Sequence, residues 1–232
     1  MFEKYKIIED KIDFVNYFIT TKEVDAKNRE DMTMVLNKNS MNIEKLTSNI
    51  QTHSNIVNKI DENNIGQKIE GDALITNLKN VPLLVFTADC VPITLIDTKN
   101  KAVGLIHAGW RGTYDKIVKN TLDMMKKEYN THEKDVIAII GVSIGGCCYE
   151  VSEELVEKFN TNFTNPRKKF YKIVDGKYIL DLWKVNENVL FECGVEEIIN
   201  LELCTVCNND KFYSYRKDVQ TPKRIGTVVE II

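Results

Sequence analysis

The sequence predicts an α/β fold, in which a single layered domain spanning residues 1–232 holds a central mixed β-sheet flanked by helices. Apolar, β-rich runs alternate irregularly with helical patterns, and one hairpin lies among them. The chain has only 4 prolines and 11 glycines and shows no internal repeat, which argues against a flexible tether between two domains. With 232 residues, of which 43% are hydrophobic, it can build a core without disulfide support.

The N-terminal part of the chain carries few clear patterns. Residues 24–66 are polar and rich in Asn, Asp and Lys. We expect a helix at residues 28–38, followed in residues 42–61 by a second helix and a strand.

Signals become clearer from residue 72. The expected strands are apolar runs bounded by polar clusters: 72–77, 81–90, 91–97, 102–108, 135–145, 196–203 and 225–232. The third and fourth form a hairpin, because only "TKNK" separates them. The expected helices show apolar residues at helical spacing: 113–129 with Thr113 as N-cap, 152–159 with Ser152 as N-cap, and 181–194 closed by Gly194.

Charge and targeting signals narrow the class of protein. The net charge of −3 gives no general attraction to nucleic acid or to an anionic membrane, so neither is expected as a partner. No apolar run of signal-peptide or membrane-span length is present, and we expect a cytoplasmic protein with six free thiols. The chain contains neither GxGxxG nor GxxxxGK[ST], which excludes those two kinds of nucleotide site. Monomer and homodimer both stay open.

Three residues have the chemistry of a metal site. Cys90 and His107 end apolar runs, and His53 lies in "IQTHSN". Two imidazoles and one thiolate bind Zn²⁺ well and leave a fourth position open for water or substrate. Their separations match no local zinc motif, so the spacing leaves open whether the three meet. The third histidine, His132, is expected in an exposed loop.

Polar residues near these three admit two interpretations each. Asp72 and Asp89 lie at the ends of apolar runs, where a carboxylate either caps a turn or assists a metal ligand or an acid–base step. Arg111 precedes an expected helix, where an arginine beside free backbone N–H groups binds an anion or pairs with a surface acid. Trp110 is expected in the core.

The remaining cysteines and aromatics gave weaker signals. Cys204 and Cys207 form a CxxC, but a zinc ribbon needs a second such pair and the adjacent Cys147 and Cys148 have the wrong spacing. We therefore expect Cys204 and Cys207 to be packing thiols rather than zinc ligands. The alternation in "FYSYRKD", residues 212–218, suggests a strand whose aromatic face either stacks a base or fills the core.

In order along the chain, several stretches resemble one known family: "QTHS", "GDALIT", "TADCVPITLID", "AVGLIHAGWRGT", "IGGCCYEV", "LDLWKVN", "LCTVCNNDKFYSYRKD" and "TPKR". The family is described both as multicopper polyphenol oxidase (laccase-like) domains and as metal-dependent purine nucleoside phosphorylases. The resemblance implies a layered α/β domain and a zinc site of His53, Cys90 and His107, with copper as the other possible metal.

The same resemblance implies phosphorolysis of adenosine, inosine and methylthioadenosine to a free base and a ribose 1-phosphate, together with deamination of adenosine. Purine nucleosides and phosphate would be the small-molecule partners. The expected catalytic residues are His53, Cys90, His107, Arg111 and Asp89. The expected substrate- or phosphate-binding residues are Arg111, Asp72, Cys148, Tyr149 and Arg216.

The sequence departs from the family pattern in three places. Lys22 stands where the family has an arginine and either replaces it or leaves its contact missing. Two prolines are replaced by Val142 and Gly146, and Arg224 is slightly displaced in "TPKR". Three other functions stay open. They are a copper-dependent polyphenol oxidase, a cysteine hydrolase with Cys90 as nucleophile and His107 as base, and a non-catalytic metal-binding or partner-binding module.

Overall fold

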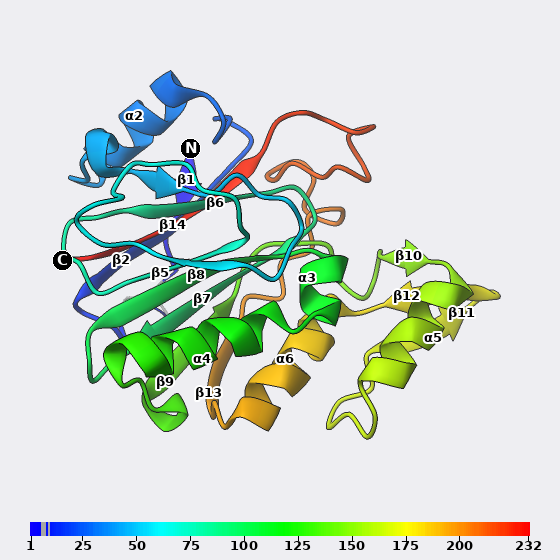
Figure 1. The fold of residues 1–232 in the computed structure, drawn as a ribbon. Helices are drawn as coiled ribbons and strands as arrows, with labels where there is room; N and C mark the ends of the chain where they lie inside the picture. The colour runs from blue at the N-terminus through cyan, green and yellow to red at the C-terminus, as the bar shows by residue number, and fades with distance from the viewer. Residues whose placement is uncertain (6–7, 9) are drawn as a thin grey trace.

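The computed structural model, which describes residues 1–5, 8 and 10–232, consists of two large mixed sheets covered by helices (Figure 1). The first sheet has the strand order β1 (Phe2–Glu3), β2 (Val15–Thr20), β14 (Ile225–Ile231), β6 (Leu83–Thr87), β3 (Thr47–Ser48). The second has the order β13 (Glu197–Asn200), β9 (Val136–Ile140), β7 (Val91–Asp97), β8 (Ala102–Ala108), β5 (Ala73–Thr76), β4 (Val57–Lys59). The predicted α/β class with a mixed sheet flanked by helices is confirmed, and the structure adds a second large sheet.

Three apolar clusters separate four layers. Helix α2 (Arg29–Lys38) packs on the outer face of the first sheet, where Phe18, Leu84 and Val228 are buried. A second cluster fills the space between the two sheets. The third lies between the second sheet and helices α4 (Ile117–Tyr129) and α6 (Leu182–Cys193). The order is therefore helix, sheet, sheet, helices.

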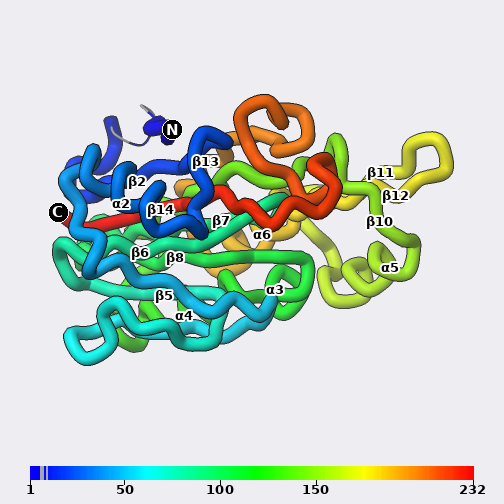
Figure 2. The backbone as a smooth tube through the Cα atoms, turned by 90° about the horizontal axis from the view of Figure 1, so that it is seen from above, coloured from blue at the N-terminus to red at the C-terminus, as the bar shows by residue number. Residues whose placement is uncertain are grey.

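A smaller unit extends from one end of these layers. It is an antiparallel sheet of β10 (Glu150–Val151), β12 (Lys177–Leu180) and β11 (Tyr171–Val174), which lies beside helix α5 (Glu153–Asn162). Figures 1 and 2 both place it at the end of the molecule opposite the C-terminus. Among the described residues, no helix combines the length and the apolar character needed to cross a bilayer.

Most expected elements are present. The hairpin is β7 and β8, which pair from Val91–Ala108 to Asp97–Ala102. Helix α2 begins after Asn28, whose side chain accepts from two backbone N–H groups of the first turn. Helix α6 begins after Asp181 and ends at Gly194, which has the left-handed conformation (φ +94°) that glycine adopts without strain.

The prediction of a single helix at residues 113–129 is wrong. The chain forms a short helix α3 (Trp110–Tyr114), breaks at Lys116 in a left-handed conformation (φ +54°), and then begins α4. Thr113 is therefore inside α3, and Gly109 is its N-cap. The break lets α3 follow the strand end while α4 turns to pack along the sheet.

Two further expectations fail for local reasons. The helix expected within residues 42–61 is only a 3₁₀ turn, Ile43–Lys45, although the following strand β4 is present. Residues 212–218 form turns rather than a strand. The Asp218 carboxylate accepts a hydrogen bond from the Ser214 backbone N–H at 2.9 Å, which closes the segment on itself. The prediction of one domain over residues 1–232 stays a prediction.

Candidate metal centre and substrate cavities

His107 reaches the site through the alternation of side chains along β8. Val103 and Leu105 are buried between the two sheets, so His107, two residues further, faces the same side. It lies near the end of the strand, where the apolar layer gives way to a cavity. The 3% exposed His107 is thus a polar residue at the edge of the core.

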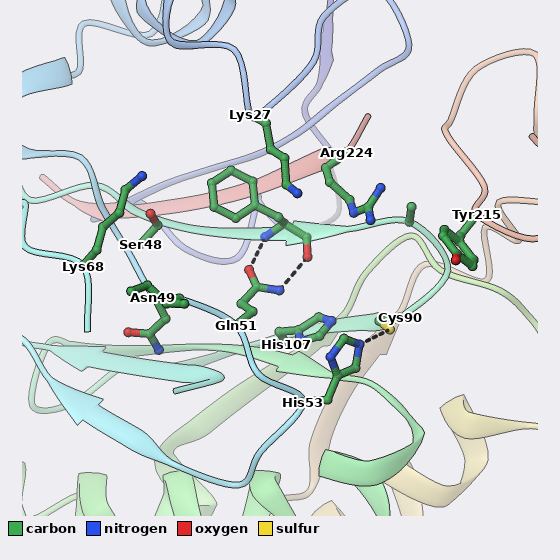
Figure 3. A pocket seen from close by; sticks show the side chains of 13 residues that line it. Lys27, Ser48, Asn49, Gln51, His53, Lys68, Cys90, His107, Tyr215 and Arg224 are labelled. Carbon is green, nitrogen blue, oxygen red and sulfur yellow. Dashed lines mark hydrogen bonds between the residues drawn. The ribbon is translucent and has the colours of Figure 1, made fainter. Parts of the chain in front are cut away.

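The other two members of the trio come from loops. Cys90 directly precedes β7, and His53 lies between β3 and β4. Cys90 Sγ lies 3.9 Å from His53 Nε2, and the two imidazole centroids are 4.9 Å apart. The potential ligand atoms of His53, Cys90 and His107 all lie within 4.8 Å of one another. Figure 3 shows the three side chains grouped together.

A buried carboxylate organises both histidines. Asp72 is fully buried, and its Oδ1 accepts from His107 Nδ1 at 2.7 Å and from the His53 backbone N–H at 3.1 Å. Its Oδ2 accepts from the Ser54 backbone N–H and hydroxyl, both at 2.7 Å. Burial alone raises the pKa of Asp72, but the hydrogen bonds from His107 and Ser54 outweigh it and hold the pKa far below its usual range. Asp72 therefore stays ionised and leaves His107 Nε2 free for a ligand.

The His53 loop is held in a strained backbone conformation. His53 has φ +59°, which a non-glycine residue adopts only when its surroundings enforce it. Gln51 anchors the loop to β6 by donating to the Phe86 carbonyl at 2.8 Å and accepting from the Phe86 N–H at 2.7 Å (Figure 3). A Cβ at Gly109 would lie 2.9 Å from His53 Cδ2 and 3.2 Å from Cys90 Sγ. Glycine there lets the loop and Cys90 approach each other.

The thiol and the imidazole shift each other's ionisation. Burial raises the pKa of Cys90, but His107 and His53 outweigh it and lower the pKa to about 6. Burial lowers the pKa of His107, whereas the Cys90 thiolate and Asp72 raise it to about 9. Without metal the pair is therefore a Cys90 thiolate beside a protonated His107 at neutral pH. The thiolate is the form that binds metal, and metal binding releases the His107 proton from Nε2.

The trio fits a tetrahedral zinc ion. Bond lengths of about 2.3 Å to sulfur and about 2.0–2.1 Å to nitrogen place a sulfur and a nitrogen ligand roughly 3.6 Å apart. The separation of 3.9 Å between Cys90 Sγ and His53 Nε2 is within a few tenths of this value. The contact between Asp72 and His107 supplies the carboxylate that supports a ligating histidine in many zinc sites.

Two cavities meet at the trio. The larger has a volume of about 670 Å³, and its lining includes Ser48, Asn49, Gln51, Phe86, Lys27, Lys68 and Arg224. The smaller has about 230 Å³, and its lining includes Asp89, Trp110, Arg111, Tyr149, Leu182 and Arg216. His53, Cys90, Ala88 and Tyr215 line both. His53 and Cys90 therefore face both spaces, whereas His107 lines the larger one alone.

Four residues expected at the site line the smaller cavity. They are Asp89, Arg111, Tyr149 and Arg216. The Asp89 carboxylate accepts from Thr205 Oγ1 at 2.6 Å and from the Arg216 backbone N–H at 2.7 Å, so it ties the 205–216 segment to the cavity. The Arg111 guanidinium lies 4.9 Å from the Trp110 ring. Trp110 is half-buried and lines the cavity, so the core interpretation is incomplete.

Three expectations need correction. Asp72 is fully buried and its carboxylate holds the histidine loop, so it has no surface with which to contact a substrate. Cys148 lines neither cavity and instead lies 3.5 Å from Cys207. Lys22 does not replace the family's arginine at the site, because it pairs with Asp218 at 2.9 Å.

Lys27, Lys68 and Gln51 were missed from the sequence. Lys27 and Lys68 line the larger cavity as isolated lysines in the polar N-terminal region, where no pattern marks them. Gln51 stands two residues before His53, and only the pairing with β6 reveals its role. Arg224 lines this cavity despite its displaced position in the sequence.

Comparison with known proteins identifies the family of this chain. Residues 7–232 match the family model described as multi-copper polyphenol oxidoreductase laccase. A purine nucleoside phosphorylase from Clostridium acetobutylicum is 34% identical over 237 residues, covering 98% of this chain and 96% of that protein. Adenosine deaminase RL5, from an unidentified prokaryote, is 36% identical over 178 residues, covering 72% of this chain and 68% of that protein.

The fold agrees with that of a solved structure. The crystal structure of the hypothetical protein YfiH from Bacillus licheniformis superposes with a TM-score of 0.87 at 26% identity, covering 94% of this chain and 93% of that one. The family match spans residues 7–232, and the Clostridium acetobutylicum relative covers 98% of the chain. The chain therefore belongs to the laccase-like multi-copper polyphenol oxidoreductase family, in which curated relatives are named purine nucleoside phosphorylases.

Proposed function

We propose that this protein is a zinc-dependent purine nucleoside phosphorylase that converts adenosine, inosine and methylthioadenosine to the free base and ribose 1-phosphate or its methylthio analogue. The observation that carries the proposal is the open three-ligand set of His53, Cys90 and His107 at the junction of two cavities. The name of the Clostridium acetobutylicum relative supports the same activity.

The two cavities suit the two substrates of phosphorolysis. In this reaction phosphate attacks the anomeric carbon while the bond to the base breaks, so the two reactants must approach the same carbon from different sides. The larger cavity, with Phe86 and Tyr215 among its walls, accommodates the nucleoside. The smaller cavity, with Arg111 and Arg216, accommodates the phosphate. The reacting carbon then lies beside the trio.

Side chains of the smaller cavity hold and orient the anion. Arg111 and Arg216 supply guanidinium N–H donors, which match phosphate oxygens in pairs. Burial raises the pKa of Tyr149 to about 12, so its phenol stays protonated and donates to an anion. Trp110 and Leu182 exclude water from the anion. This positioning converts a reaction between two free molecules into one within a single complex.

The trio would hold the zinc ion, which acts when bound as a Lewis acid that orients phosphate or activates water. Water activation is the chemistry that deamination of adenosine requires, and we include this second activity in the proposal because one relative is named an adenosine deaminase. Asp72 keeps His107 oriented in either reaction.

Two alternatives are weighed by specific observations. A cysteine hydrolase stays in consideration because Cys90 interacts with His107, which in turn is hydrogen-bonded to Asp72. This is the order of nucleophile, base and orienting carboxylate in such enzymes. A multi-copper oxidase requires many histidines, but the chain has three and His132 is an exposed residue before β9. The donor set therefore favours the zinc enzyme over the oxidase.

The proposal is tested by measuring hypoxanthine release from inosine with and without phosphate. We expect release that depends on phosphate and forms ribose 1-phosphate in equal amount. His107→Ala should lose activity on the order of 10³-fold, because several kcal/mol of metal-assisted stabilisation is removed. His132→Ala is the matched control and should keep full activity. Release without phosphate, or an active His107→Ala variant, would overturn the proposal.

A further inference from the structure

Four cysteines that are far apart in the sequence gather at one place beside the smaller cavity. Cys147 and Cys148 follow the glycine turn after β9, and Cys204 and Cys207 lie in the turn after β13. Their four sulfur atoms all lie within 4.8 Å of one another. Cys207 Sγ is 3.6 Å from Cys147 Sγ and 3.5 Å from Cys148 Sγ.

The adjacent cysteines Cys147 and Cys148 both place their sulfur atoms near Cys207, although their sequence spacing matches no zinc ribbon. The backbone N–H groups of Cys148 and Tyr149 both donate to the Gly145 carbonyl, at 2.9 and 3.1 Å. This tight turn brings the sulfur atoms of Cys147 and Cys148 to 3.6 and 3.5 Å from Cys207 Sγ. Adjacent cysteines thus act here as the second pair that a four-thiol site needs.

Packing does not explain the cluster. Cys204 is buried, but Cys147 and Cys207 are exposed and Cys148 is half-buried. Exposed thiols gain little hydrophobic stabilisation from meeting one another. Spacings of 3.5 and 3.6 Å are also far longer than the sulfur–sulfur bond of about 2.05 Å in a disulfide. They are close to the roughly 3.8 Å between two sulfur ligands of a tetrahedral zinc ion with bonds of about 2.3 Å.

The backbone around Cys204 suits a charged sulfur atom. The Gly145 N–H donates to Cys204 Sγ at 3.3 Å. Donors of this kind stabilise a thiolate, the form that a metal requires. The two segments are also joined by hydrogen bonds from Thr205 N–H to the Ser143 carbonyl at 3.0 Å.

We propose that Cys147, Cys148, Cys204 and Cys207 bind a second Zn²⁺ ion in a closed, four-thiolate structural site. Four protein ligands leave no open position, so this ion binds no substrate. It clamps the segment that carries Tyr149 to the segment that carries Thr205, the residue that holds Asp89. The site therefore sets the shape of one wall of the smaller cavity. It does not depend on the function proposed above.

Metal content of the full-length protein, purified under reducing conditions, tests the proposal. We expect two zinc ions per chain in the wild type and one in Cys207→Ser. His107→Ala should also hold one, and the combination of both changes should hold none. Cys193→Ser, which alters a half-buried cysteine of α6 outside both groups, is the control and should keep two.

Cobalt substitution identifies the ligands independently of zinc counting. In His107→Ala protein loaded with Co²⁺, a four-thiolate site gives strong sulfur-to-cobalt charge-transfer absorption, and Cys207→Ser should remove most of it. If Cys207→Ser does not fold, the spectrum of the His107→Ala protein and the exposed Cys147→Ser variant provide the same test. Equal zinc content in wild type and Cys207→Ser, a disulfide among the four found by mass spectrometry, or absent charge-transfer absorption would each overturn the proposal.

Discussion

The two proposed metal sites differ in how the fold supports them. His53, Cys90 and His107 meet where strands end, and the buried Asp72 orients both histidines. The four cysteines lie on turns, are partly exposed, and have backbone N–H groups in place of a carboxylate. Three ligands beside cavities leave room for substrate, whereas four ligands leave none. On these proposals the open site performs chemistry and the closed site maintains shape.

The largest expected effect comes from removing the thiolate of the open site. Cys90→Ala should lose one zinc ion per chain and lower kcat/KM on the order of 10³-fold, because the open site no longer holds its metal. Metal analysis beside inosine phosphorolysis checks both losses. Activity lost with full zinc content would instead identify Cys90 as a nucleophile and support the cysteine hydrolase.

The supporting carboxylate is next. Asp72→Asn should weaken zinc binding at the open site about 10- to 100-fold, because the amide orients His107 less firmly. Zinc competition with a chelator of known affinity measures the change. Asp97→Asn is the matched control. Asp97 is a fully buried carboxylate that caps the turn of the β7–β8 hairpin, at the end away from His107. Equal weakening in both variants would contradict a specific role for Asp72.

The two cavities predict different effects for two arginines. Arg111→Ala should raise the KM for phosphate about 10- to 100-fold, the loss expected for one or two charged hydrogen bonds worth roughly 1.5–3 kcal/mol. Arg224→Ala, at the larger cavity, should leave the KM for phosphate unchanged. Steady-state kinetics with phosphate as the varied substrate checks the pair. The reverse result would exchange the substrates between the two cavities.

The smallest expected effect is at the four-cysteine site. Cys207→Ser should raise the KM for phosphate severalfold, a loss of about 1 kcal/mol in binding free energy, and leave kcat nearly unchanged. The reason is that the wall of the smaller cavity loosens while the open site stays intact. Cys193→Ser should change neither constant. A loss of kcat as large as that of Cys90→Ala would show that the two sites do not divide chemistry and shape as described.

The sequence revealed the open site more readily than the closed one. His53, Cys90 and His107 were singled out because imidazole and thiolate suit zinc, and the structure brings them together. Asp72 was marked as a supporting carboxylate by its place at the end of an apolar run, but not as the residue that also holds the His53 backbone. Cys147 and Cys148 were set aside because sequence spacing says nothing about a turn that directs two neighbours toward one point.

Local patterns also account for the failures in the fold. Helical spacing over residues 113–129 did not reveal the break at Lys116, because apolar periodicity continues across it. The alternation in residues 212–218 suggested a strand, whereas hydrogen bonds to Asp218 close it into turns. The second large sheet was not foreseen, since strand pairing between residues far apart leaves no local signal.

The sequence by itself determined the α/β class, the β7–β8 hairpin, the closure of α6 by Gly194, and the residue types able to bind zinc. These properties depend on periodicity and side-chain chemistry, which neighbouring residues carry. The tertiary structure alone decided that His53 lies beside His107, that Lys27 and Arg224 share a cavity, and that four cysteines meet. Those contacts join residues that lie from 54 positions apart, for His53 and His107, to 197 positions apart, for Lys27 and Arg224, and only the packing of two sheets brings them together.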